Sequence, residues 1–476
     1  MKYELLKEIA KNSKRKIIVV QGLGFVGAVM SLVCANTTKE DYLVFGIDLK
    51  SQKKKIDSIN SGKFPINASD KKIIKFYANS RKNKNFFATH DERVFSLADF
   101  IIVDINLDVK KNSSVNGKLL SYDVNLDNFK KGIVSIGKNC KENVLVLVET
   151  TVPPGTCINL IRPTILNELK KRKLSTDKLK IGHSYERVMP GPNYIDSIIN
   201  FYRVYSGIDE ASADETEKFL KTIISTHKYP LTRLMNTNAT EMAKVLENSY
   251  RSYNIAFAVE WSRYAEEAGV NLYEIVNAIR MRPTHSNMML PGIGVGGYCL
   301  TKDPLLASWA KVNNFKSNKN LEQSELGVFI NDQMPLFCFN FLKKSFKLKS
   351  FFNLKVLLLG VSYRSDVGDT RYSPVELLYK LLKRDNASIT LHDPYVDYWE
   401  EIDMNINQNL YEILNFEQDI IVISTGHKEY LKRETISKFS EMKNIKFLDT
   451  VGLFNENEIK LIGENNSIKV LGRGDL

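Results

Sequence analysis

A glycine-rich segment followed by a cysteine is the strongest candidate for covalent chemistry in this sequence. Four of the six residues from 292 to 297 are glycine, which suits neither a helix nor a strand interior. Such a loop, with Gly294 and Gly296 at its centre, favours backbone amides that wrap a phosphate. Cys299 follows, and the nearby amides and Lys302 favour its thiolate, so the segment predicts a nucleophile. The alternative is a buried cysteine beside a structural turn.

A second glycine cluster has the spacing of a dinucleotide-binding turn. Gly22, Gly24 and Gly27 follow an apolar run and open a helical one. The first permits the turn, the second lets the backbone approach a pyrophosphate, and the third lets the helix pack on the strand. Asp48, at the end of the next predicted strand, would accept from ribose hydroxyls and repel a 2′-phosphate. The pattern predicts NAD rather than NADP; the alternative is a glycine-rich turn without a ligand.

Three shorter segments carry weaker signals. Lys244 and Asn248 are four residues apart, so one helix face presents both, a pair suited to steadying an oxyanion. A solvated lysine is the alternative.

Thr151 lies in a Pro-Pro-Gly segment after an apolar run, where parallel sheets place ligands, although a plain turn explains it equally well. Glu186 lies on a loop after another apolar run and is a candidate general base or a residue that holds a water molecule. The alternative is a surface ion pair.

Two parallel sheets are needed to position these residues. Short apolar runs alternate with helical stretches in the first third of the chain and again near its end, a pattern typical of sheets covered on both faces. The predicted strands are 16–21, 42–47, 100–103 and 144–147, then 355–360, 388–392, 419–424 and 445–448. The predicted fold class is α/β, with two Rossmann-like parallel-sheet domains joined by a long central helix and a helical middle domain.

One long helix, 238–269, dominates the middle of the chain. It has no internal glycine or proline. Asn238 and Glu241 resemble a capping box at its start, and Gly269 is a stop signal. At about 1.5 Å per residue its length is about 45 Å, typical of a helix that bridges domains or subunits. Its largely apolar face comprises Met242, Leu246, Ser249, Tyr253, Ala256 and Val259.

Composition excludes several classes of protein. The 476 residues are 43% hydrophobic and 26% charged, which indicates more than one core-forming domain rather than a disordered chain. The net charge of +12 comes from scattered lysines without interleaved aromatic residues, so no nucleic-acid partner is expected. The uncharged run 17–35 contains glycines and is interpreted as a buried strand and helix, with no membrane association expected. Five widely spaced cysteines form no metal-ligand pattern, so no metal is expected. Their number and spacing indicate free thiols and therefore a reducing, cytoplasmic location.

Together these segments resemble the UDP-glucose/GDP-mannose dehydrogenase family of nucleotide-sugar 6-dehydrogenases, in the family's order over about residues 15–475. The segment 296–303 is similar to the family's catalytic cysteine motif, and 360–371 to the signature that opens its UDP-binding domain. The resemblance implies an N-terminal extension (1–15), an NAD-binding Rossmann-like domain (16–235), a central helical domain for dimerisation and catalysis (236–335) and a UDP-sugar-binding α/β domain (336–476). It also implies a homo-oligomer, at least a dimer.

The resemblance assigns roles to individual residues. The catalytic set that it implies is Cys299, Lys244, Asn248, Asp303, Glu186 and Thr151. The cofactor set is Gly22, Gly24, Phe25, Val26, Gly27, Asp48, Thr151 and Arg371. The substrate set is Glu186, Arg187, Lys244, Asn248, Arg282, Gly294, Gly296, Tyr363 and Arg364. Two segments depart from the family pattern. Residues 104–107 replace a V-x-T-P expected near the nicotinamide ribose, and Tyr363-Arg364 replaces Phe-Lys.

The segment 185–191 bears on the substrate. It looks like the P-E-R-x-x-P-G of members that act on UDP-N-acetylhexosamines, and the segment 281–291 also looks like that branch. The resemblance then implies two successive oxidations at C6, through a Cys299 thiohemiacetal and thioester, to a uronate for surface polysaccharide precursors. The alternatives are UDP-glucose as substrate, a two-electron hydroxyacid-type dehydrogenase that does not need Cys299, and a non-catalytic nucleotide-sugar sensor.

Overall fold

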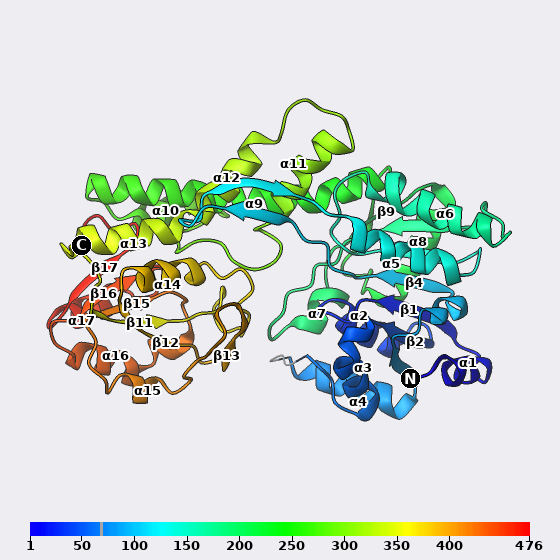
Figure 1. The fold of residues 1–476 in the computed structure, drawn as a ribbon, viewed down its shortest axis with the longest axis horizontal. Helices are drawn as coiled ribbons and strands as arrows, with labels where there is room; N and C mark the ends of the chain where they lie inside the picture. The colour runs from blue at the N-terminus through cyan, green and yellow to red at the C-terminus, as the bar shows by residue number, and fades with distance from the viewer. Residues whose placement is uncertain (67–69) are drawn as a thin grey trace. The chain divides into compact units, whose positions relative to one another are not determined.

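The computed structural model describes residues 1–66 and 70–476 (Figure 1). The chain folds into two compact units. Unit 1 comprises Met1–Val109, Val124–Leu246 and Trp309–Asn320, and unit 2 comprises Lys110–Asp123, Glu247–Ser308 and Leu321–Leu476. Each unit contains a parallel or mainly parallel sheet flanked by helices, so the predicted α/β fold class is confirmed.

Unit 1 is built on an eight-stranded sheet with the order β10-β9-β8-β7-β4-β1-β2-β3. All neighbours are parallel except β8 with β9. The strand order reverses between β1 and β4, and the carboxyl ends at such a reversal are where open sheets bind ligands. The strands are β1 (Lys16–Gln21), β2 (Tyr42–Ile47), β3 (Phe86–Thr89), β4 (Phe100–Val103), β7 (Leu145–Val148), β8 (Lys180–His183), β9 (Val204–Gly207) and β10 (Thr232–Arg233).

Helices cover this sheet and explain its unbroken apolar strands. Nine of the ten residues of α2 are buried, because α2 packs on β1 and β2 and also contacts α4 and α7. The helices of unit 1 are α1 (Tyr3–Lys11), α2 (Gly27–Asn36), α3 (Lys53–Ser61), α4 (Lys71–Asn83), α5 (Asp127–Asn139), α6 (Arg162–Lys171), α7 (Tyr194–Ile199) and α8 (Glu210–Ile223).

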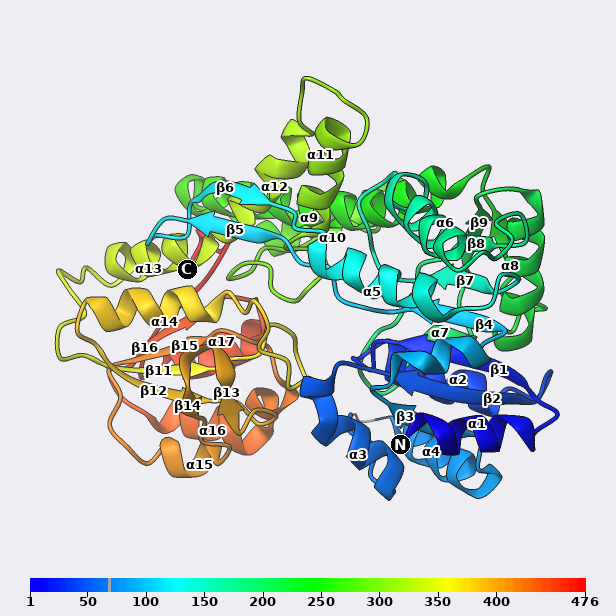
Figure 2. The ribbon, with the colours of Figure 1, turned by 45° about the vertical axis from the view of Figure 1, so that its right-hand side comes forward.

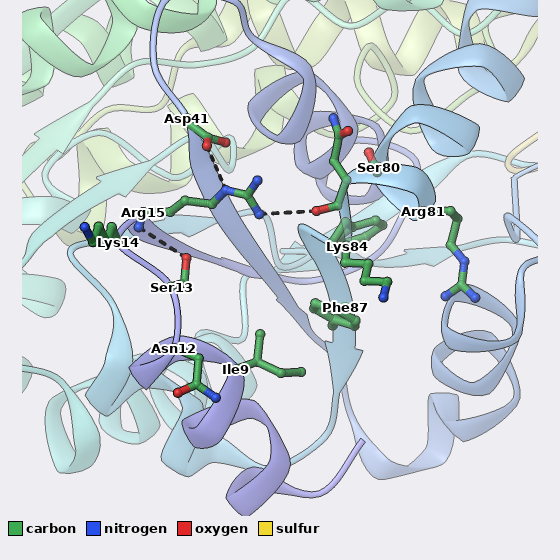
Figure 3. A pocket seen from close by; sticks show the side chains of 12 residues that line it. Ile9, Asn12, Ser13, Lys14, Arg15, Asp41, Ser80, Arg81, Lys84 and Phe87 are labelled. Atoms are coloured by element: carbon green, nitrogen blue, oxygen red, sulfur yellow. Dashed lines mark hydrogen bonds and ion pairs between the residues drawn. The ribbon is translucent and has the colours of Figure 1, made fainter.

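The predicted N-terminal extension forms α1, which packs on unit 1 through the fully buried Leu6. Arg15 follows it and donates to Asp41 Oδ2 at 2.8 Å and to the carbonyl oxygen of Asn83 at 3.3 Å. A hollow of about 760 Å³ lies beside these residues (Figure 3). Its lining comes from the amino ends of β1 and β3 and the end of α4, whereas the glycine loop follows the carboxyl end of β1. This hollow is therefore not the predicted cofactor site.

Unit 2 is built on a five-stranded parallel sheet with the order β12-β11-β15-β16-β17, and Figure 1 shows α14 and α16 on its two faces. The order reverses between β11 and β15, which gives a second switch point. The strands of unit 2 are β5 (Lys110–Ser113), β6 (Leu119–Asp123), β11 (Lys355–Leu359), β12 (Ser388–His392), β13 (Tyr398–Trp399), β14 (Met404–Asn405), β15 (Ile420–Ile423), β16 (Lys446–Asp449) and β17 (Ser467–Val470). Its helices are α10 (Leu272–Arg280), α11 (Asp303–Asn313, whose last turns belong to unit 1), α12 (Glu322–Asp332), α13 (Met334–Ser345), α14 (Val375–Arg384), α15 (Leu410–Ile413), α16 (Arg433–Glu441) and α17 (Glu456–Gly463).

Strands β5 and β6 form an antiparallel hairpin that belongs to unit 2, although the sequence suggests that this segment lies inside the domain 16–235. Lys111 Nζ lies 2.9 Å from Asp332 Oδ2, and Tyr122 donates to Glu325, both acceptors being on α12. Figure 2 shows the hairpin beside that helix. Its strands are mostly exposed, so no apolar alternation marks them in the sequence.

The long predicted helix is α9 (Thr237–Ala268), and Gly269 ends it with a φ of 70°. The expected capping box is wrong. Asn236, two residues before Asn238, caps the helix, because its side-chain oxygen accepts from the amide three residues on at 3.0 Å. The carboxylate of Glu241 binds a neighbouring loop instead.

The predicted apolar face of α9 is divided between the core and the surface. Ala256 and Val259 are buried, whereas Met242 and Leu246 are 51% and 63% exposed. An exposed apolar stripe continues along the helix through Tyr250, Phe257, Trp261 and Tyr264.

The described residues include neither a helix that could span a membrane nor a cluster of metal-ligating side chains. None of the helices in 1–66 and 70–476 is both long and apolar enough to cross a membrane. The same part of the chain contains no group of three or more His, Cys, Asp or Glu side chains arranged to hold a metal ion.

Candidate functional site

In the loop after β1, close packing leaves room only for glycine at Gly22 and Gly27, whereas Gly24 faces open space. A Cβ on Gly22, whose φ is 95°, would lie 2.5 Å from the carbonyl oxygen of Asp104. A Cβ on Gly27 would lie 1.9 Å from the carbonyl oxygen of Gly22. A Cβ on Gly24 would have no atom of the described residues within 4 Å. The chain's own packing therefore requires the outer glycines, while the middle one leaves bare backbone for a ligand.

Asp48 follows β2 and turns its carboxylate toward this loop. Its Oδ2 accepts from the amide of Leu23 at 3.1 Å, and its Oδ1 accepts from the amide of Leu49 at 2.8 Å. Lys55 Nζ lies 3.5 Å from Oδ2. The carboxylate is placed to accept from ribose hydroxyls, and the lysine offsets part of its repulsion for a 2′-phosphate.

Phe25 and Val26 complete the loop. The Phe25 side chain is 41% exposed, and its carbonyl oxygen accepts a 2.5 Å hydrogen bond from Tyr194, which ties the loop to α7. Val26 is the residue before α2, so the first amides of that helix lie at the end of the loop. The open Gly24, the Asp48 carboxylate and the start of α2 together fit NAD.

Glu186 and Lys244, predicted from separate motifs, lie together in unit 1. Lys244 Nζ donates to the carbonyl oxygen of Glu186 at 3.2 Å and lies 3.7 Å from its Oε1. Glu186 Oε2 accepts from the amide of Val188 at 2.5 Å, so the loop holds its own carboxylate. The ring of Tyr185 lies 5.2 Å from Lys244 Nζ. An ammonium that is 10% exposed beside one carboxylate can stabilise an oxyanion or transfer a proton.

Arg187 lies in the same loop with its guanidinium fixed by aromatic rings. Its Cζ is 5.1 Å from the ring centre of Tyr185 and 5.6 Å from that of Phe201. One terminal nitrogen also donates to the Tyr185 hydroxyl at 3.3 Å. Stacking orients the planar fork and so favours directional donation to a carbonyl or phosphate oxygen.

Sequence reasoning missed the contact of Glu241 with the loop that follows Thr151. The Glu241 carboxylate accepts from the amides of Gly155 and Cys157 at 2.6 and 2.8 Å, just beyond Thr151 in the same loop. Burial raises its pKa to about 7, although these hydrogen bonds lower it. Glu241 precedes Lys244 by three residues on α9, so it ties the Thr151 loop to the helical turn that carries Lys244. Its spacing from the start of the helix resembled a capping box and concealed this contact.

Asn248, Asp303 and Cys299 come together in unit 2. Asn248 Nδ2 donates to Asp303 Oδ2 at 2.6 Å, and Lys302 Nζ lies 3.0 Å from Oδ1. Asp303 opens α11, and its amide donates to the carbonyl oxygen of Cys299 at 2.9 Å. Cys299 is exposed, whereas the other four cysteines are buried. A thiol just before a helix start is favourably placed as a nucleophile.

Close packing accounts for the glycines that precede Cys299. A Cβ on Gly296 would lie 2.3 Å from the Tyr363 side chain, and one on Gly297, whose φ is 79°, would lie 2.7 Å from the Tyr363 ring. A Cβ on Gly294 would lie 2.9 Å from Pro374. These glycines let the cysteine loop pack on the segment 363–374, and phosphate binding by their amides stays a prediction.

Arg371 belongs to this group in unit 2. Its carbonyl oxygen accepts from the Gly297 amide at 2.9 Å, and its guanidinium lies 2.6 Å from Asp369 Oδ2. Burial lowers the pKa of Arg371, but the bonds to Asp369 outweigh it and the net shift is upward. Burial also raises the pKa of Tyr363 to about 12. The contact of Arg371 with NAD stays a prediction.

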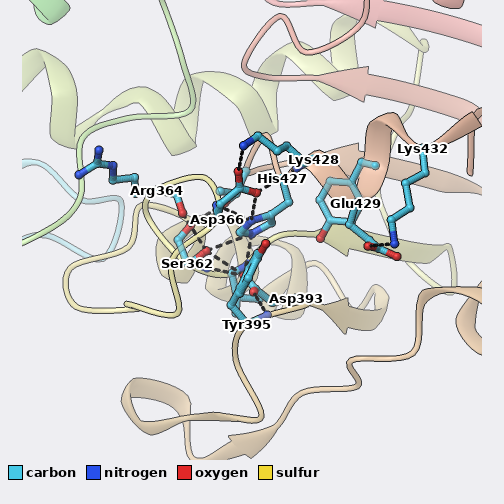
Figure 4. Close-up of polar contacts among 12 residues, drawn as sticks. Ser362, Arg364, Asp366, Asp393, Tyr395, His427, Lys428, Glu429 and Lys432 are labelled. Atoms are coloured by element: carbon cyan, nitrogen blue, oxygen red, sulfur yellow. Dashed lines mark hydrogen bonds and ion pairs between the residues drawn. The ribbon is translucent and has the colours of Figure 1, made fainter. Parts of the chain in front are cut away.

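A buried network holds the loop 360–366. Asp393 Oδ2 accepts from two amides of this loop at 2.9 Å and lies 3.1 Å from His427 Nε2 (Figure 4). His427 Nδ1 accepts from the amide of Asp366 at 2.9 Å. Figure 4 shows Arg364 directed away from this network, so the network holds the loop backbone while the arginine side chain is exposed.

The predicted residues therefore form two groups. Arg282, which follows α10, is exposed, and its side chain forms no hydrogen bond or ion pair with the described residues of either group. Lys244 and Asn248 lie one turn apart on the continuous α9, and each contacts a carboxylate from another motif. Unit 1 brings together Glu186, Arg187 and Lys244, and unit 2 brings together Asn248, Cys299, Asp303, Tyr363 and Arg371.

Three models of one family match the chain in order. The NAD binding domain of the UDP-glucose/GDP-mannose dehydrogenase family matches residues 16–224, its central domain matches 238–325 and its UDP binding domain matches 357–456.

Similar proteins match almost the full chain. The UDP-N-acetyl-D-mannosamine dehydrogenase of Methanococcus vannielii is 29% identical over 98% of this chain and 99% of its own length. That of Methanocaldococcus jannaschii is 29% identical over 99% of both chains. Among solved structures, the UDP-D-ManNAc dehydrogenase of Pyrococcus horikoshii has a TM-score of 0.79 at 25% identity, covering 97% of this chain and 100% of its own. The NDP-N-acetyl-D-galactosaminuronic acid dehydrogenase of Methanosarcina mazei has a TM-score of 0.77 at 25% identity, covering 100% and 99%.

Proposed function

We propose a substrate and a reaction course for this chain, which belongs to the UDP-glucose/GDP-mannose dehydrogenase family and is an NAD-dependent nucleotide-sugar dehydrogenase. It oxidises the C6 hydroxyl of a UDP-N-acetylhexosamine to the uronate, and UDP-N-acetyl-D-mannosamine is the first candidate. The observation that carries the reaction course is the placement of Lys244 and Asn248 on adjacent turns of α9, bonded to Glu186 and Asp303.

The first oxidation needs a base at the C6 hydroxyl. Asp303 and Lys244 assist removal of the hydroxyl proton, directly or through water. When bound, NAD would supply the acceptor for the hydride that leaves C6 in each of the two oxidations. The aldehyde stays in the site, where Cys299 is the available nucleophile.

Cys299 then carries the covalent steps. The thiolate adds to the aldehyde carbon, a C–S bond forms, and the carbonyl electron pair moves to oxygen. The Lys244 ammonium and the Asn248 amide stabilise this thiohemiacetal oxyanion. Loss of the second hydride leaves a thioester. Thr151, Glu186 and Asp303 position the water that adds to it, the C–S bond breaks, and the thiolate is regenerated. In sum, one alcohol, two NAD and one water give one carboxylate, two NADH and three protons.

The segment 185–191 supports the choice of an N-acetylated sugar. Arg187, oriented by the rings of Tyr185 and Phe201, is a donor for the carbonyl oxygen of an acetamido group. Relatives named for UDP-N-acetyl-D-mannosamine that align over nearly the full chain support the same class. The product, a UDP-linked uronate, suits the synthesis of surface polysaccharide precursors.

A homodimer paired through α9 completes the proposal. The helix exposes an apolar stripe that includes Leu246, Tyr250, Trp261 and Tyr264. A contiguous stripe of large apolar side chains is typical of a protein interface. A second copy of this chain is the proposed occupant.

The test of the reaction is NADH stoichiometry with a panel of UDP-sugars. Limiting UDP-N-acetyl-D-mannosamine with excess NAD should give two NADH per sugar and a product with one new carboxylate. One NADH per sugar with a released aldehyde would contradict the covalent course, and turnover of no UDP-sugar would contradict the proposed function.

A further inference from the structure

Two carboxyl groups that the reaction does not use lie at the ends of adjacent strands in unit 1. Asp104 follows β4 and Glu149 follows β7. The Glu149 side chain is fully buried, and its Oε1 is 2.7 Å from Arg203 Nη2. Its Oε2 and the buried Oδ2 of Asp104 have no hydrogen-bond partner among the described residues. Two unpartnered buried oxygens in one place require an explanation, since a buried ionised carboxylate without a partner is costly.

The charges around this pair do not balance. Asp104 interacts electrostatically with Glu149, Glu186 and Arg203, and Lys244 Nζ lies 3.7 Å from Glu186 Oε1. Three carboxyl groups therefore share two cations, and one acid is in excess. Cys34 of α2, itself buried, is a further neighbour with a raised pKa. Burial is the main cause that raises the pKa of Glu149 to about 7, and burial together with Glu149 raises that of Asp104 well above its ordinary value. Together with the two unpartnered buried oxygens, these shifts favour a retained proton on the acid pair.

Asp104 also touches the cofactor loop. Its amide donates to the carbonyl oxygen of Gln21, the last residue of β1, at 2.8 Å. A Cβ on Gly27 would lie 3.1 Å from its Cβ. Asp104 thus lies at the switch point between β1 and β4, while Asp48 marks the ribose end of the loop on the β2 side. A dinucleotide that passes over the loop from β2 must bring its other end to the β4 side, where the acid pair is.

We propose that the Asp104–Glu149 acid pair is a proton-linked sensor of the oxidised nicotinamide ring, which releases its proton when that cationic ring binds. The ring of NAD carries a positive charge that NADH lacks, and the two molecules are otherwise alike. A nearby cation favours the ionised carboxylate, so the proton leaves when the oxidised form binds and stays when the reduced form binds. Binding of NAD then strengthens as the pH rises, and binding of NADH does not. This inference uses the NAD site and not the identity of the sugar.

Calorimetric titration of the full chain without UDP-sugar, in buffers of different ionisation enthalpy, measures the protons released per ligand bound. Near neutral pH we expect up to about one proton released per NAD and almost none per NADH, with the affinity for NAD rising by up to about tenfold per pH unit. Equal proton counts for the two ligands would overturn the proposal. UDP-sugar turnover is measured separately, so failure here is distinct from failure of the proposed reaction.

Variants identify the group responsible. Asp104→Asn should reduce proton release on NAD binding by at least half, and Asp127→Asn, an exposed acid at the start of α5, should leave it unchanged. If Asp104→Asn does not fold, Glu149→Gln serves as the second variant. The comparison of proton release on NAD and NADH binding to the wild type tests the proposal without any variant. Wild-type proton release in a folded Asp104→Asn variant would refute the assignment.

Discussion

The amide of Asn248 donates a 2.6 Å hydrogen bond to a carboxylate with no exposed surface, that of Asp303. Lys302 Nζ lies 3.0 Å from the other carboxylate oxygen, so both oxygens are bonded. This commits one N–H of Asn248 and fixes the plane of its amide, so the second N–H is the donor for the proposed oxyanion. The orienting bond lies within one unit and joins α9 to the start of α11. Asp303 therefore has a positioning effect on Asn248 in addition to any proton transfer.

Replacing Cys299 with serine should abolish uronate formation and leave UDP-sugar binding intact. A hydroxyl is a far weaker nucleophile than a thiolate at neutral pH, so the rate should fall by at least about a thousandfold. The measurement is steady-state NADH release, with binding followed by calorimetry. Cys140→Ala, at a buried cysteine far from the motif in sequence, should keep its activity. Substantial uronate turnover by the serine variant would exclude the thioester course.

Replacing Asp48 with asparagine should weaken the preference for NAD over NADP. The carboxylate repels a 2′-phosphate, and without it Lys55, now 3.5 Å from Oδ2, is free to attract that group. We expect the ratio of kcat/KM values for the two cofactors to change by about tenfold or more, equivalent to about 1.4 kcal/mol. Asp48→Asn combined with Lys55→Ala should lose the gain toward NADP. An unchanged ratio in the single variant would show that Asp48 does not select the cofactor.

Glu241 should make the protein less stable as the pH rises through neutrality. Its pKa is about 7 in the fold against an ordinary value of 4.5, so between these values the folded state binds the extra proton. The free energy of unfolding contributed by this group is highest at low pH and is lost as the pH rises to about 7. Glu241→Gln should therefore flatten the dependence of Tm on pH.

The same variant should lower kcat, since an amide group presents an N–H to one of the two loop amides and shifts the Thr151 loop. Glu274→Gln, at an exposed position on α10, is the matched control and should keep the wild-type slope. A Glu241→Gln profile parallel to that of the wild type would show that Glu241 does not titrate in this range.

Trp261→Glu should convert the proposed dimer to a monomer. Trp261 is 44% exposed in the apolar stripe of α9, and a buried unpaired charge at an interface is strongly unfavourable. Light scattering at micromolar concentration measures the mass of the wild type and the variant. Phe416→Glu replaces an equally apolar side chain, 60% exposed outside that helix, and should leave the mass unchanged. A monomeric wild type would refute the pairing.

The sequence predicted the elements with strong periodicity and failed where contacts are non-local. The apolar runs that became β1, β4 and β15 lie in sheets covered on both faces, so burial itself marks them. The β5–β6 hairpin has mostly exposed strands and depends on Lys111 and Tyr122 reaching α12, which no local pattern signals. Asp104 was seen only as a departure from a motif, because its importance depends on Glu149 and Arg203 from other strands.

The site residues divide in the same way. The motifs indicated Glu186 and Lys244 separately, and only the fold places them 3.7 Å apart. Glu241 is the opposite case: its spacing from Asn238 had a sufficient local explanation, and that explanation was wrong because Asn236 caps the helix. Local spacing is ambiguous whenever a polar side chain has both a helix end and a neighbouring loop within reach.

The last prediction concerns the sugar. UDP-N-acetyl-D-mannosamine or a close epimer should be a better substrate than UDP-glucose, because a site built around an acetamido group leaves polar groups unpaired when a hydroxyl replaces it. Each such loss costs about 1–3 kcal/mol, or about ten- to a hundredfold in kcat/KM. Arg187→Lys keeps the charge but loses the stacked, planar guanidinium. It should therefore lower kcat/KM for UDP-N-acetyl-D-mannosamine more than it lowers kcat/KM for UDP-glucose. Arg162→Lys, exposed at the start of α6, is the control. Initial NADH rates with equal concentrations of the UDP-sugars decide the question. A clear preference for UDP-glucose would overturn the substrate assignment and leave the reaction type intact, whereas a preference for GDP-mannose would also contradict the choice of a uridine nucleotide.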